Sequence, residues 1–233
     1  MMSILNEQIC IIPARGGSRR IKNKNIKRFN GRPIISYSIN SAKKTNLFSE
    51  IIISSDSKSI KKVINKIPKT FFLKRPKKLS GDKTPTRPVI KHALEQYSKK
   101  GINPSYICYI TATAPFIRHK DIIDAFKILK KNKKINFVVS VTKFSYPLLR
   151  SLKISKKGTI SFWKKKYMYV RSQDLEQFYH DAGQFYWARS DAIKKNLSTF
   201  SDKTLPFVIP NYRVIDIDDN EDWKNAEIMS KYL

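Results

Sequence analysis

The sequence predicts a single α/β domain with a mainly parallel central sheet covered by helices. Short apolar runs alternate along the chain with longer amphipathic segments, which is the pattern of strands connected by helices. The length of 233 residues suits one such domain, and a hydrophobic content of 41% is that of a globular protein.

Each predicted element follows from its local pattern of apolar residues. Uninterrupted apolar runs predict strands at 8–13, 50–56, 71–76, 106–115 and 136–144. Apolar residues at helical spacing predict helices at 33–44, 57–67, 88–100 and 121–132. Pro33 suits a first helical turn, and Gly101 suits the end of a helix. Asp56, at the tip of the second strand, is expected to cap the helix that follows.

The alternation breaks after residue 144. Basic and aromatic residues at about 145–180 predict a small hairpin insertion. A strand at 182–189 and one or two strands within 205–218 resume the sheet. A last helix at 220–233 has Asp219 or Asn220 as its expected cap. The whole chain, 1–233, is therefore predicted to be one domain with an insertion.

The charge of the chain is strongly positive. Lys and Arg number 47 against 18 Asp and Glu, which gives a formal net charge of +29. Such a field attracts polyanions, so nucleic-acid binding is one alternative. The lysines are scattered over helices and loops, however, and no recognised nucleic-acid motif is present. A solvated basic surface without a specific nucleic-acid partner is the favoured interpretation.

The cysteines and the hydropathy pattern bear on the compartment. Cys10 and Cys108 each lie in an apolar, strand-like run without a CxxC neighbour, so we expect reduced thiols in the core. No uninterrupted apolar window is long enough to span a membrane, and the start lacks the pattern of a secretion signal. We expect a cytoplasmic protein without a membrane partner.

The segment after the first predicted strand, IIPARGGSRRIKNKNI, has the composition of an anion site. Gly16 and Gly17 permit positive φ angles and close approach, so backbone N–H groups can line a concavity for phosphate oxygens. Arg15, Arg19 and Lys24 add positive charge. The segment has neither P-loop nor dinucleotide-binding spacing. A phosphate-binding loop is the favoured interpretation, and a glycine turn with basic surface residues is the alternative.

An acidic counterpart occurs near the end of the chain, in IDIDDNED at 215–222. Asp216 and Asp218 alternate on a predicted strand and would therefore share one face, which suits a Mg²⁺ ion bridging phosphates. Asp219, Glu221 and Asp222 are expected only to charge the N-terminus of the last helix.

The loop RSQDLEQFYHDAGQFYW at 171–187 is rich in side chains that hydrogen-bond sugars and carboxylates. A nucleophilic triad of Ser172, His180 and Asp181 has no support, because residues so close in sequence seldom assemble one.

Taken together, these segments resemble a known family. PARGGSRRIKNKN is similar to the N-terminal nucleotide-binding motif of the CMP-sugar synthetases, the acylneuraminate cytidylyltransferase family, and SSDS, RPKKLS, TATAPF and DIDDNEDW extend the resemblance over nearly the whole chain. RSQDLEQFYHDAGQFYW is most similar to the pseudaminic acid cytidylyltransferases within it.

The resemblance implies a fold and an activity. It implies a Rossmann-like nucleotidyltransferase fold of the α/β class, with helices on both faces of a mainly parallel sheet and a small hairpin insertion that reaches a second copy in a homodimer. The implied reaction uses CTP and Mg²⁺: the anomeric hydroxyl of pseudaminic acid, a nonulosonic acid, attacks the α-phosphorus and releases pyrophosphate. The product would serve bacterial surface-glycan or flagellin glycosylation.

The resemblance also assigns residues. Implied contributors to catalysis at the α-phosphate are Arg15, Lys24 and Asn25. Implied contacts of the nucleotide are Ala14, Gly16, Gly17, Ser18, Arg75, Thr84 and Thr86. Implied contacts of the sugar are Thr111, Arg171, Gln173, His180 and Gln184. Asp216 and Asp218 would bind the metal.

Two departures bear on the choice of sugar. The chain reads TATAP at 111–115 where the sialic acid enzymes typically have a Gln-Pro-Thr-Ser-Pro-like loop, and HDAG at 180–183 where they commonly have Arg-Pro-Asn-Gly. Both departures fall where the sugar is expected and argue against sialic acid. Legionaminic acid and N-acetylneuraminic acid remain the alternatives within the family.

Overall fold

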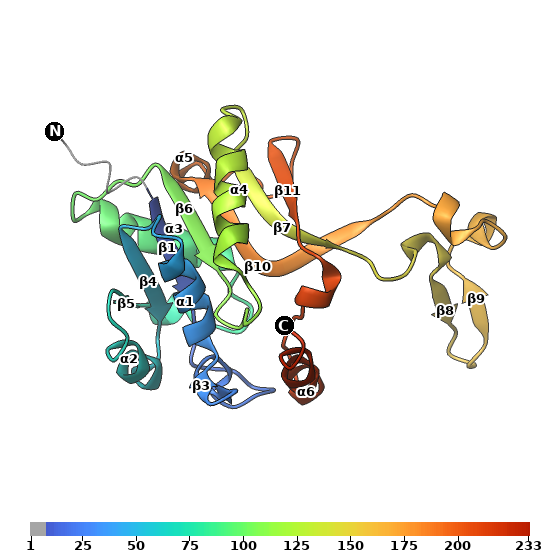
Figure 1. Ribbon diagram of the computed structural model, residues 1–233, viewed down its shortest axis with the longest axis horizontal. Coiled ribbons are helices and arrows are strands. Elements are labelled where there is room, and N and C mark those ends of the chain that lie inside the picture. The colour runs from blue at the N-terminus through green and yellow to red at the C-terminus, as the bar shows by residue number, and fades with distance from the viewer. Residues whose placement is uncertain (1–7) are drawn as a thin grey trace.

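The computed structural model describes residues 8–233 and is built around a seven-stranded sheet (Figure 1). The strands of this sheet are β1 Gln8–Pro13, β4 Glu50–Ser55, β5 Phe71–Lys74, β6 Tyr106–Ile110, β7 Phe137–Lys143, β10 Tyr179–Arg189 and β11 Thr204–Val208. Their order is β11-β7-β10-β6-β1-β4-β5, and β10 runs antiparallel to both neighbours while the other pairs are parallel. The predicted mainly parallel sheet is confirmed.

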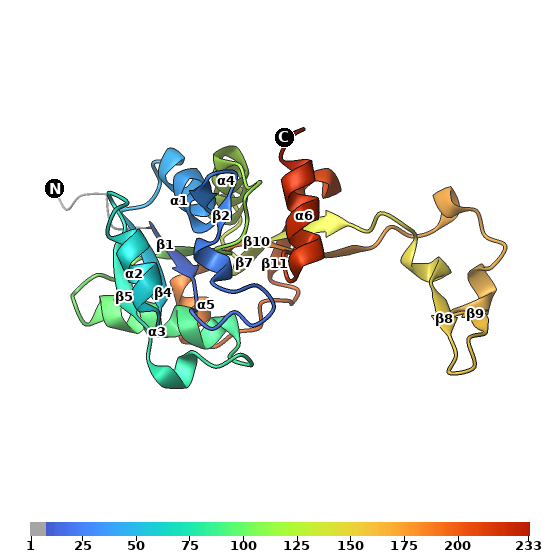
Figure 2. The same cartoon turned by 90° about the horizontal axis from the view of Figure 1, so that it is seen from below.

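Helices cover both faces of this sheet (Figure 2). The helices are α1 Ile35–Lys44, α2 Lys58–Ile64, α3 Thr86–Ser98, α4 His119–Lys131, α5 Ser190–Lys194 and α6 Asn220–Met229. Residues of α1, α2 and α4 share one hydrophobic cluster, and residues of α3 and α5 share a second one. β1 alternates between the clusters, with Cys10 and Ile12 in the first and Ile9 and Ile11 in the second. Burial on both faces explains why the strand is continuously apolar.

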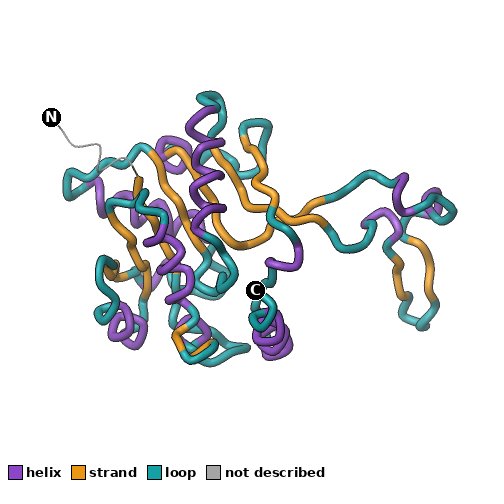
Figure 3. The backbone as a smooth tube through the Cα atoms, viewed as in Figure 1, coloured by secondary structure: helices purple, strands orange, loops and turns teal. Residues whose placement is uncertain are grey.

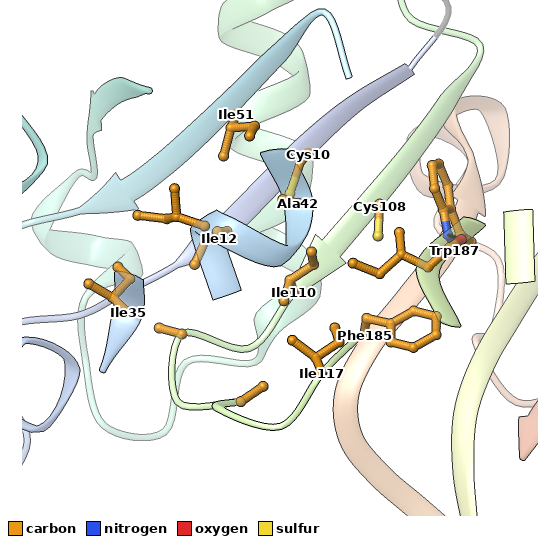
Figure 4. Packing of buried hydrophobic residues seen from close by; sticks show 14 of the residues in the cluster. Cys10, Ile12, Ile35, Ala42, Ile51, Cys108, Ile110, Ile117, Phe185 and Trp187 are labelled. Atoms are coloured by element: carbon orange, nitrogen blue, oxygen red, sulfur yellow. Dashed lines mark hydrogen bonds between the residues drawn. The ribbon is translucent and has the colours of Figure 1, made fainter. Parts of the chain in front are cut away.

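The first cluster contains the largest buried aromatic side chain of the described residues. Trp187 is fully buried, stacks on Phe126 with ring centroids 4.5 Å apart, and donates its indole N–H to the carbonyl of Ile122 at 2.9 Å. Figure 4 shows Trp187 and Phe185 close to Ile110 and Ile117. A fully buried side chain of this kind contributes about 1.5–3 kcal/mol through the area it removes from water.

The two cysteines lie in the same cluster as neighbours on paired strands. Cys10 and Cys108 are Cα partners in the β1–β6 register, and both are buried free thiols. Burial raises the pKa of each thiol, so both stay protonated. The prediction of reduced core thiols is confirmed.

Residues 145–178, called the arm below, project from the end of the sheet (Figures 1 and 3). The arm carries the hairpin β8 Leu152–Ile154 and β9 Ile160–Phe162, at the position where the sequence predicts an insertion. Ile154 and Ile160 are exposed by 75% and 67%. Within one chain these apolar side chains stay in contact with water, so their burial does not stabilise the fold.

Three local predictions are wrong. Pro33 belongs to a small hairpin, β2 Arg28–Phe29 and β3 Arg32–Pro33, whose turn residues Asn30 and Gly31 have φ angles of 45° and 79°. Positive φ at both turn residues is the geometry that Asn-Gly favours. The helix predicted to begin at 88 begins at Thr86, since proline is tolerated in a first turn that needs no N–H partner.

The third wrong prediction concerns the end of the sheet. One strand, β11, forms in this region, in agreement with the predicted one or two, but Asp216 and Asp218 lie outside any strand, so their predicted alternation on a strand is wrong. The backbone N–H of Asp218 donates to the Asp222 carboxylate at 2.8 Å instead of to a neighbouring strand. Asp219 caps α6 and accepts N–H groups of Glu221 and Asp222, as the sequence predicts. No helix among the described residues is long and apolar enough to cross a bilayer.

Candidate active site

The loops that leave the carboxyl ends of the parallel strands gather at one edge of the sheet. In open α/β sheets this edge is the usual ligand-binding place. β1 leads into the loop 14–27, β4 into Asp56, β5 into Arg75 and β6 into Thr111. Because β10 is antiparallel, its first residues and the roots of the arm lie at this same edge.

The loop 14–27 is held by hydrogen bonds at both of its ends. The N–H of Ala14 donates to Ser54 O at 2.9 Å, and the N–H of Gly16 donates to Asp56 Oδ1 at 2.8 Å. The buried Asn25 donates its side-chain amide to Arg15 O at 2.9 Å, which ties the start of the loop to the 3-10 turn Lys24–Ile26. Asn25 therefore shapes the loop from within.

Gly16 is required for close packing. A Cβ at this position would lie 2.8 Å from the Cβ of Ser57, a separation that real Cβ atoms do not show, whereas a Cβ at Gly17 would meet nothing within 4 Å. Neither glycine has a positive φ, so that part of the prediction is wrong. Asn23 has the positive φ of this loop, 54°.

Asp56 does not cap the helix that follows it, which corrects the prediction. The cap of α2 is Ser57, whose hydroxyl accepts the N–H of Ile60 at 3.3 Å. Asp56 has instead turned toward the glycine loop, where its carboxylate holds the N–H of Gly16. The residue that directly follows strand β4 thereby holds the loop that is expected to bind phosphate.

Two carboxylates face the cations of this loop. Asp218 accepts Lys24 Nζ at 3.2 Å and lies 2.8 Å from Arg20, and Lys24 also donates to the carbonyl of Ile217 at 2.5 Å. Burial raises the pKa of Asp218, but its hydrogen bond to Lys24 and the charges of Lys24 and Arg20 outweigh burial and hold the pKa below its usual range.

Asp82 is the second of these carboxylates. It pairs with Arg15 and lies 2.5 Å from Arg19. The hydrogen bond from Arg15, together with the charges of both arginines, outweighs desolvation and holds the pKa of Asp82 below its usual range. The cations expected to receive phosphates are thus neutralised by acidic side chains.

Asp216 and Asp218 have the chemistry of a two-carboxylate Mg²⁺ site. Asp216 is open to solvent, yet desolvation by surrounding protein and the like charge of Asp218 raise its pKa. Two carboxylates that repel each other suit a divalent cation, and Mg²⁺ is commonly held by one or two carboxylates together with substrate phosphates. Within residues 8–233 no cluster of three or more His, Cys, Asp or Glu side chains could hold a metal without such a substrate.

Arg75 follows strand β5, and the two threonines predicted for the nucleotide lie just before and at the start of α3. Arg75 is buried and donates to Ser54 O at 2.6 Å and to Ser54 Oγ at 3.3 Å. Burial lowers the pKa of Arg75, partly offset by the charge of Asp56. Thr84 lies in the loop before α3, and Thr86 opens that helix at the mouth of a cavity.

This cavity has a volume of about 290 Å³. Its lining joins residues predicted for two substrates, since Thr86 is expected to contact the nucleotide and Thr111 the sugar. Tyr109 and Tyr186 form one wall as a parallel stack with centroids 4.6 Å apart. The buried Gln184 accepts the Thr111 N–H on its backbone oxygen at 2.9 Å, and its side-chain oxygen Oε1 has no partner.

A bulge in β10 builds this wall. The β7–β10 register shifts between Asp181 and Tyr186, and Gly183 adopts a φ of 61°. Within the bulge, Asp181 accepts the Gly183 N–H at 2.9 Å and the Tyr186 hydroxyl at 2.7 and 2.8 Å. Gly183 supplies the backbone conformation that bends the strand around the cavity.

The remaining predicted sugar residues are not brought to this cavity within one chain. The ring of His180 lies tilted against that of Phe144, with centroids 4.7 Å apart, and lines a separate hollow of about 630 Å³ at the base of the arm. Arg171 and Gln173 lie exposed on the arm itself, in and beside the 3-10 turn Ser172–Asp174.

Comparison with known proteins identifies the family. The family model described as "Cytidylyltransferase" matches residues 9–203. The chain belongs to the cytidylyltransferase family. It is 36% identical to the pseudaminic acid cytidylyltransferase of Campylobacter jejuni, with 97% of each chain covered. It is 30% identical to a CMP-N,N'-diacetyllegionaminic acid synthase of the same species, over 96% of this chain and 94% of that protein.

Solved structures confirm the fold of this cytidylyltransferase. A CMP:2-keto-3-deoxy-manno-octonic acid synthetase complexed with CTP has a TM-score of 0.71 at 13% identity and covers 97% of this chain and 100% of that one. The predicted family, fold class and nucleotidyltransferase activity are confirmed.

The site of this cytidylyltransferase includes residues that the sequence did not single out. Arg87, Tyr109 and Thr199 line the cavity, and Asp82 bridges two arginines. Arg87 follows directly after Thr86, and Asp82 is the sole acidic residue between 57 and 94. A single acidic residue within so basic a stretch was the feature of the sequence that could have indicated a role for Asp82.

Proposed function

We propose that this cytidylyltransferase couples CTP to pseudaminic acid, giving the CMP-sugar and pyrophosphate for bacterial surface-glycan or flagellin glycosylation. The observation that carries the proposal is the junction of the basic loop 14–27 with Asp218 beside a cavity that Thr86 and Thr111 share. The sugar is supported by the 36% identity to a pseudaminic acid cytidylyltransferase against 30% to a legionaminic acid synthase.

The triphosphate would lie along the glycine loop. Ala14, Gly16, Gly17 and Ser18 would line the triphosphate site, in a loop shape that the N–H bonds of Ala14 to Ser54 and of Gly16 to Asp56 hold. Arg15 would become available when phosphate oxygens replace Asp82. Arg guanidinium groups bind such oxygens in bidentate fashion. Arg75, Thr84 and Thr86 would border the cytidine, with Arg75 acting through the strand end that it holds.

The reaction requires one bond to form and one to break. The anomeric oxygen of the sugar acid forms the new bond to the α-phosphorus as the bond to the pyrophosphate oxygen breaks. Lys24, half-buried beside the loop, would stabilise the negative charge that develops there, with Arg15 as a second cation. Asn25 would keep the loop in shape. The hydroxyl proton needs an acceptor, and Asp216 and Asp218 are the carboxylates beside Lys24.

We propose Asp216 and Asp218 as the residues that hold Mg²⁺. When bound, the ion would neutralise phosphate charge and help to orient the triphosphate. Lys24 would then be released from its ion pair with Asp218 and would face the substrate.

The protein is proposed to act as a homodimer. The exposed Leu152, Ile154 and Ile160 of the arm would pack on a second copy, and that contact would carry Arg171, Gln173 and His180 toward a sugar site. Cytoplasmic CTP is the natural co-substrate, and the two reduced thiols fit that compartment.

A panel of nonulosonic acids tests the proposal. Pseudaminic, legionaminic and N-acetylneuraminic acid are each incubated with CTP and Mg²⁺, and pyrophosphate release is measured. We expect the highest kcat/KM with pseudaminic acid. Turnover of legionaminic or N-acetylneuraminic acid with none of pseudaminic acid would reject the proposed sugar. If none of the three acids leads to pyrophosphate release, the proposed reaction is rejected.

A further inference from the structure

The cavity beside Thr111 contains a cation that the chain leaves almost unused. Arg87 lies half-buried in the first turn of α3 and lines the cavity. Its guanidinium donates to the hydroxyl of Thr199 and lies 5.4 Å from the ring centroid of Phe137. Among residues 8–233, no Asp or Glu side chain forms an ion pair with it.

This arrangement is unusual for a guanidinium group. Arg has five N–H donors in a planar fork, and a partly desolvated charge without an anion is unfavourable. Among residues 8–233 the two buried arginines use their donors within the protein: Arg213 pairs with Asp121 at 2.7 Å, and Arg75, which has no ion pair, donates to Ser54 O at 2.6 Å and to Ser54 Oγ at 3.3 Å. Arg87 has an aromatic ring on one side, one hydroxyl, and open cavity space.

The acidic groups near the tyrosines do not pair with Arg87. The charge of Asp181 acts on both Tyr109 and Tyr186, but its carboxylate accepts the Tyr186 hydroxyl and the Gly183 N–H. The charge of Asp216 also acts on Tyr186, and Asp216 forms no ion pair with Arg87. Asp181 therefore fixes the tyrosine wall and leaves the guanidinium unneutralised. An anion that enters the cavity would meet a lining that contains both the fork of Arg87 and two stacked aromatic rings.

We propose that Arg87 binds the carboxylate of the sugar acid and so selects an acidic sugar for this enzyme. The proposal rests on the proposed function, since it takes a nonulosonic acid as the substrate. The guanidinium fork matches a carboxylate in bidentate geometry. The stacked tyrosines offer an apolar wall to the sugar body, and the cavity of about 290 Å³ lies near the lower end of small-molecule sites.

Arg87→Met and Arg87→Lys test the inference in the full-length protein with Mg²⁺. Met keeps apolar contact with Phe137 and removes the charge, while Lys keeps the charge and removes the fork. Lys99→Met, an equal charge change at the exposed end of the same helix, is the control. We expect Arg87→Met to raise KM for the sugar acid about 10- to 100-fold, with Arg87→Lys between it and the wild type. The Kd for CTP, measured by calorimetry without sugar, should not change.

The methyl ester of the sugar acid provides a second measurement. If Arg87 binds the carboxylate, the ester raises KM for the wild type and causes little further increase in the Arg87→Met variant, because both changes remove one interaction. If the ester and the Arg87→Met substitution raise KM by factors that multiply, the inference is overturned. It is also overturned if the KM of Arg87→Met for the acid stays within twofold of the wild-type value. If Arg87→Met does not fold, the ester comparison is made with Arg87→Lys under the same criterion.

The two proposals fail in different ways. A wild-type protein that releases no pyrophosphate with any acid of the panel overturns both the function and the role of Arg87. An active wild type whose Arg87 variants discriminate acid from ester as before overturns the role of Arg87 alone.

Discussion

Lys24 Nζ lies 3.2 Å from Asp218 Oδ1, although the two residues are 194 positions apart in the chain. The contact joins the most basic segment of the protein to its most acidic one, at the edge where the parallel strands end. The side chain of Lys24 is 18% exposed and that of Asp218 is 42% exposed, so salt reaches this pair mainly from the side of the carboxylate.

Lys24→Ala is expected to reduce kcat by about 10²-fold or more, because one preorganised charge donor at the α-phosphate is lost. Pyrophosphate release measures the rate, and circular dichroism and the melting temperature check the fold. Lys22→Ala, an exposed neighbour, serves as control. An unchanged kcat would remove Lys24 from the mechanism.

Asp218→Asn is expected to raise the Mg²⁺ concentration at half-maximal activity, since one negative ligand of the proposed metal is neutralised. A metal titration at saturating CTP gives this value. Asp219→Asn is the matched control, because Asp219 keeps its capping role through an amide oxygen. A titration identical to that of the wild type would move the metal to other residues.

Gly16→Ala is expected to raise KM for CTP about tenfold, as the new Cβ would lie 2.8 Å from Ser57 Cβ and push the loop away from Asp56. Gly17→Ala introduces the same methyl group into open space and should stay within about twofold. Equal effects of the two substitutions would show that close packing at Gly16 is not what shapes the loop.

Asp82→Asn is expected to lower KM for CTP several-fold at low salt. The carboxylate of Asp82 and the triphosphate compete for Arg15 and Arg19, and the amide competes less well. Asp124→Asn, which removes an exposed pair with Lys127 on α4, controls for net charge. A raised KM would mean that Asp82 positions the arginines rather than competing for them.

The same ion pair gives Asp82 a pH signature. Its pKa is lower in the folded protein than the ordinary Asp value of about 3.9, so its contribution to stability is present above that pH and is lost as the pH falls through the lowered pKa. The difference in melting temperature between wild type and Asp82→Asn should therefore shrink below about pH 4. A difference that grows on acidification contradicts the assignment.

Ile154→Ser together with Ile160→Ser is expected to shift the protein from dimer to monomer in sedimentation experiments, because the exposed arm would lose its apolar contact. Both residues lie on the hairpin and away from the sheet, so the melting temperature of the core should change little. An unchanged sedimentation coefficient of dimer size would place the interface elsewhere.

Much of the fold was predictable because the strands are continuous apolar runs with both faces buried. The errors occur where a polar group finds a partner that the strand and helix patterns do not show. Asp56 looked like a helix cap, but the N–H of Gly16, 40 positions away, binds it. Asp218 looked like part of a strand, but Asp222 takes its N–H.

The candidate site was predictable only where it is a local motif. The glycine loop and the two aspartates could be predicted from the sequence. The proposed role of Arg87, in contrast, depends on Thr199, 112 positions away, and on a bulge in the strand that brings Tyr186 onto Tyr109. Asn30–Gly31 is a local signal for a tight turn. The prediction that Pro33 starts a helix did not take this signal into account.

The arm leaves from Lys143 and returns at Tyr179, and these two residues are Cα partners in the β7–β10 ladder. The insertion thus begins and ends at one pair of facing residues, in the position of the turn that would connect β7 to β10. A two-residue Asn-Gly link from Lys143 to Tyr179 could replace it without altering the strand order. The sheet and the arm are thus separable parts of the fold, and in the proposed dimer the arm of one copy would serve the sugar site of the other.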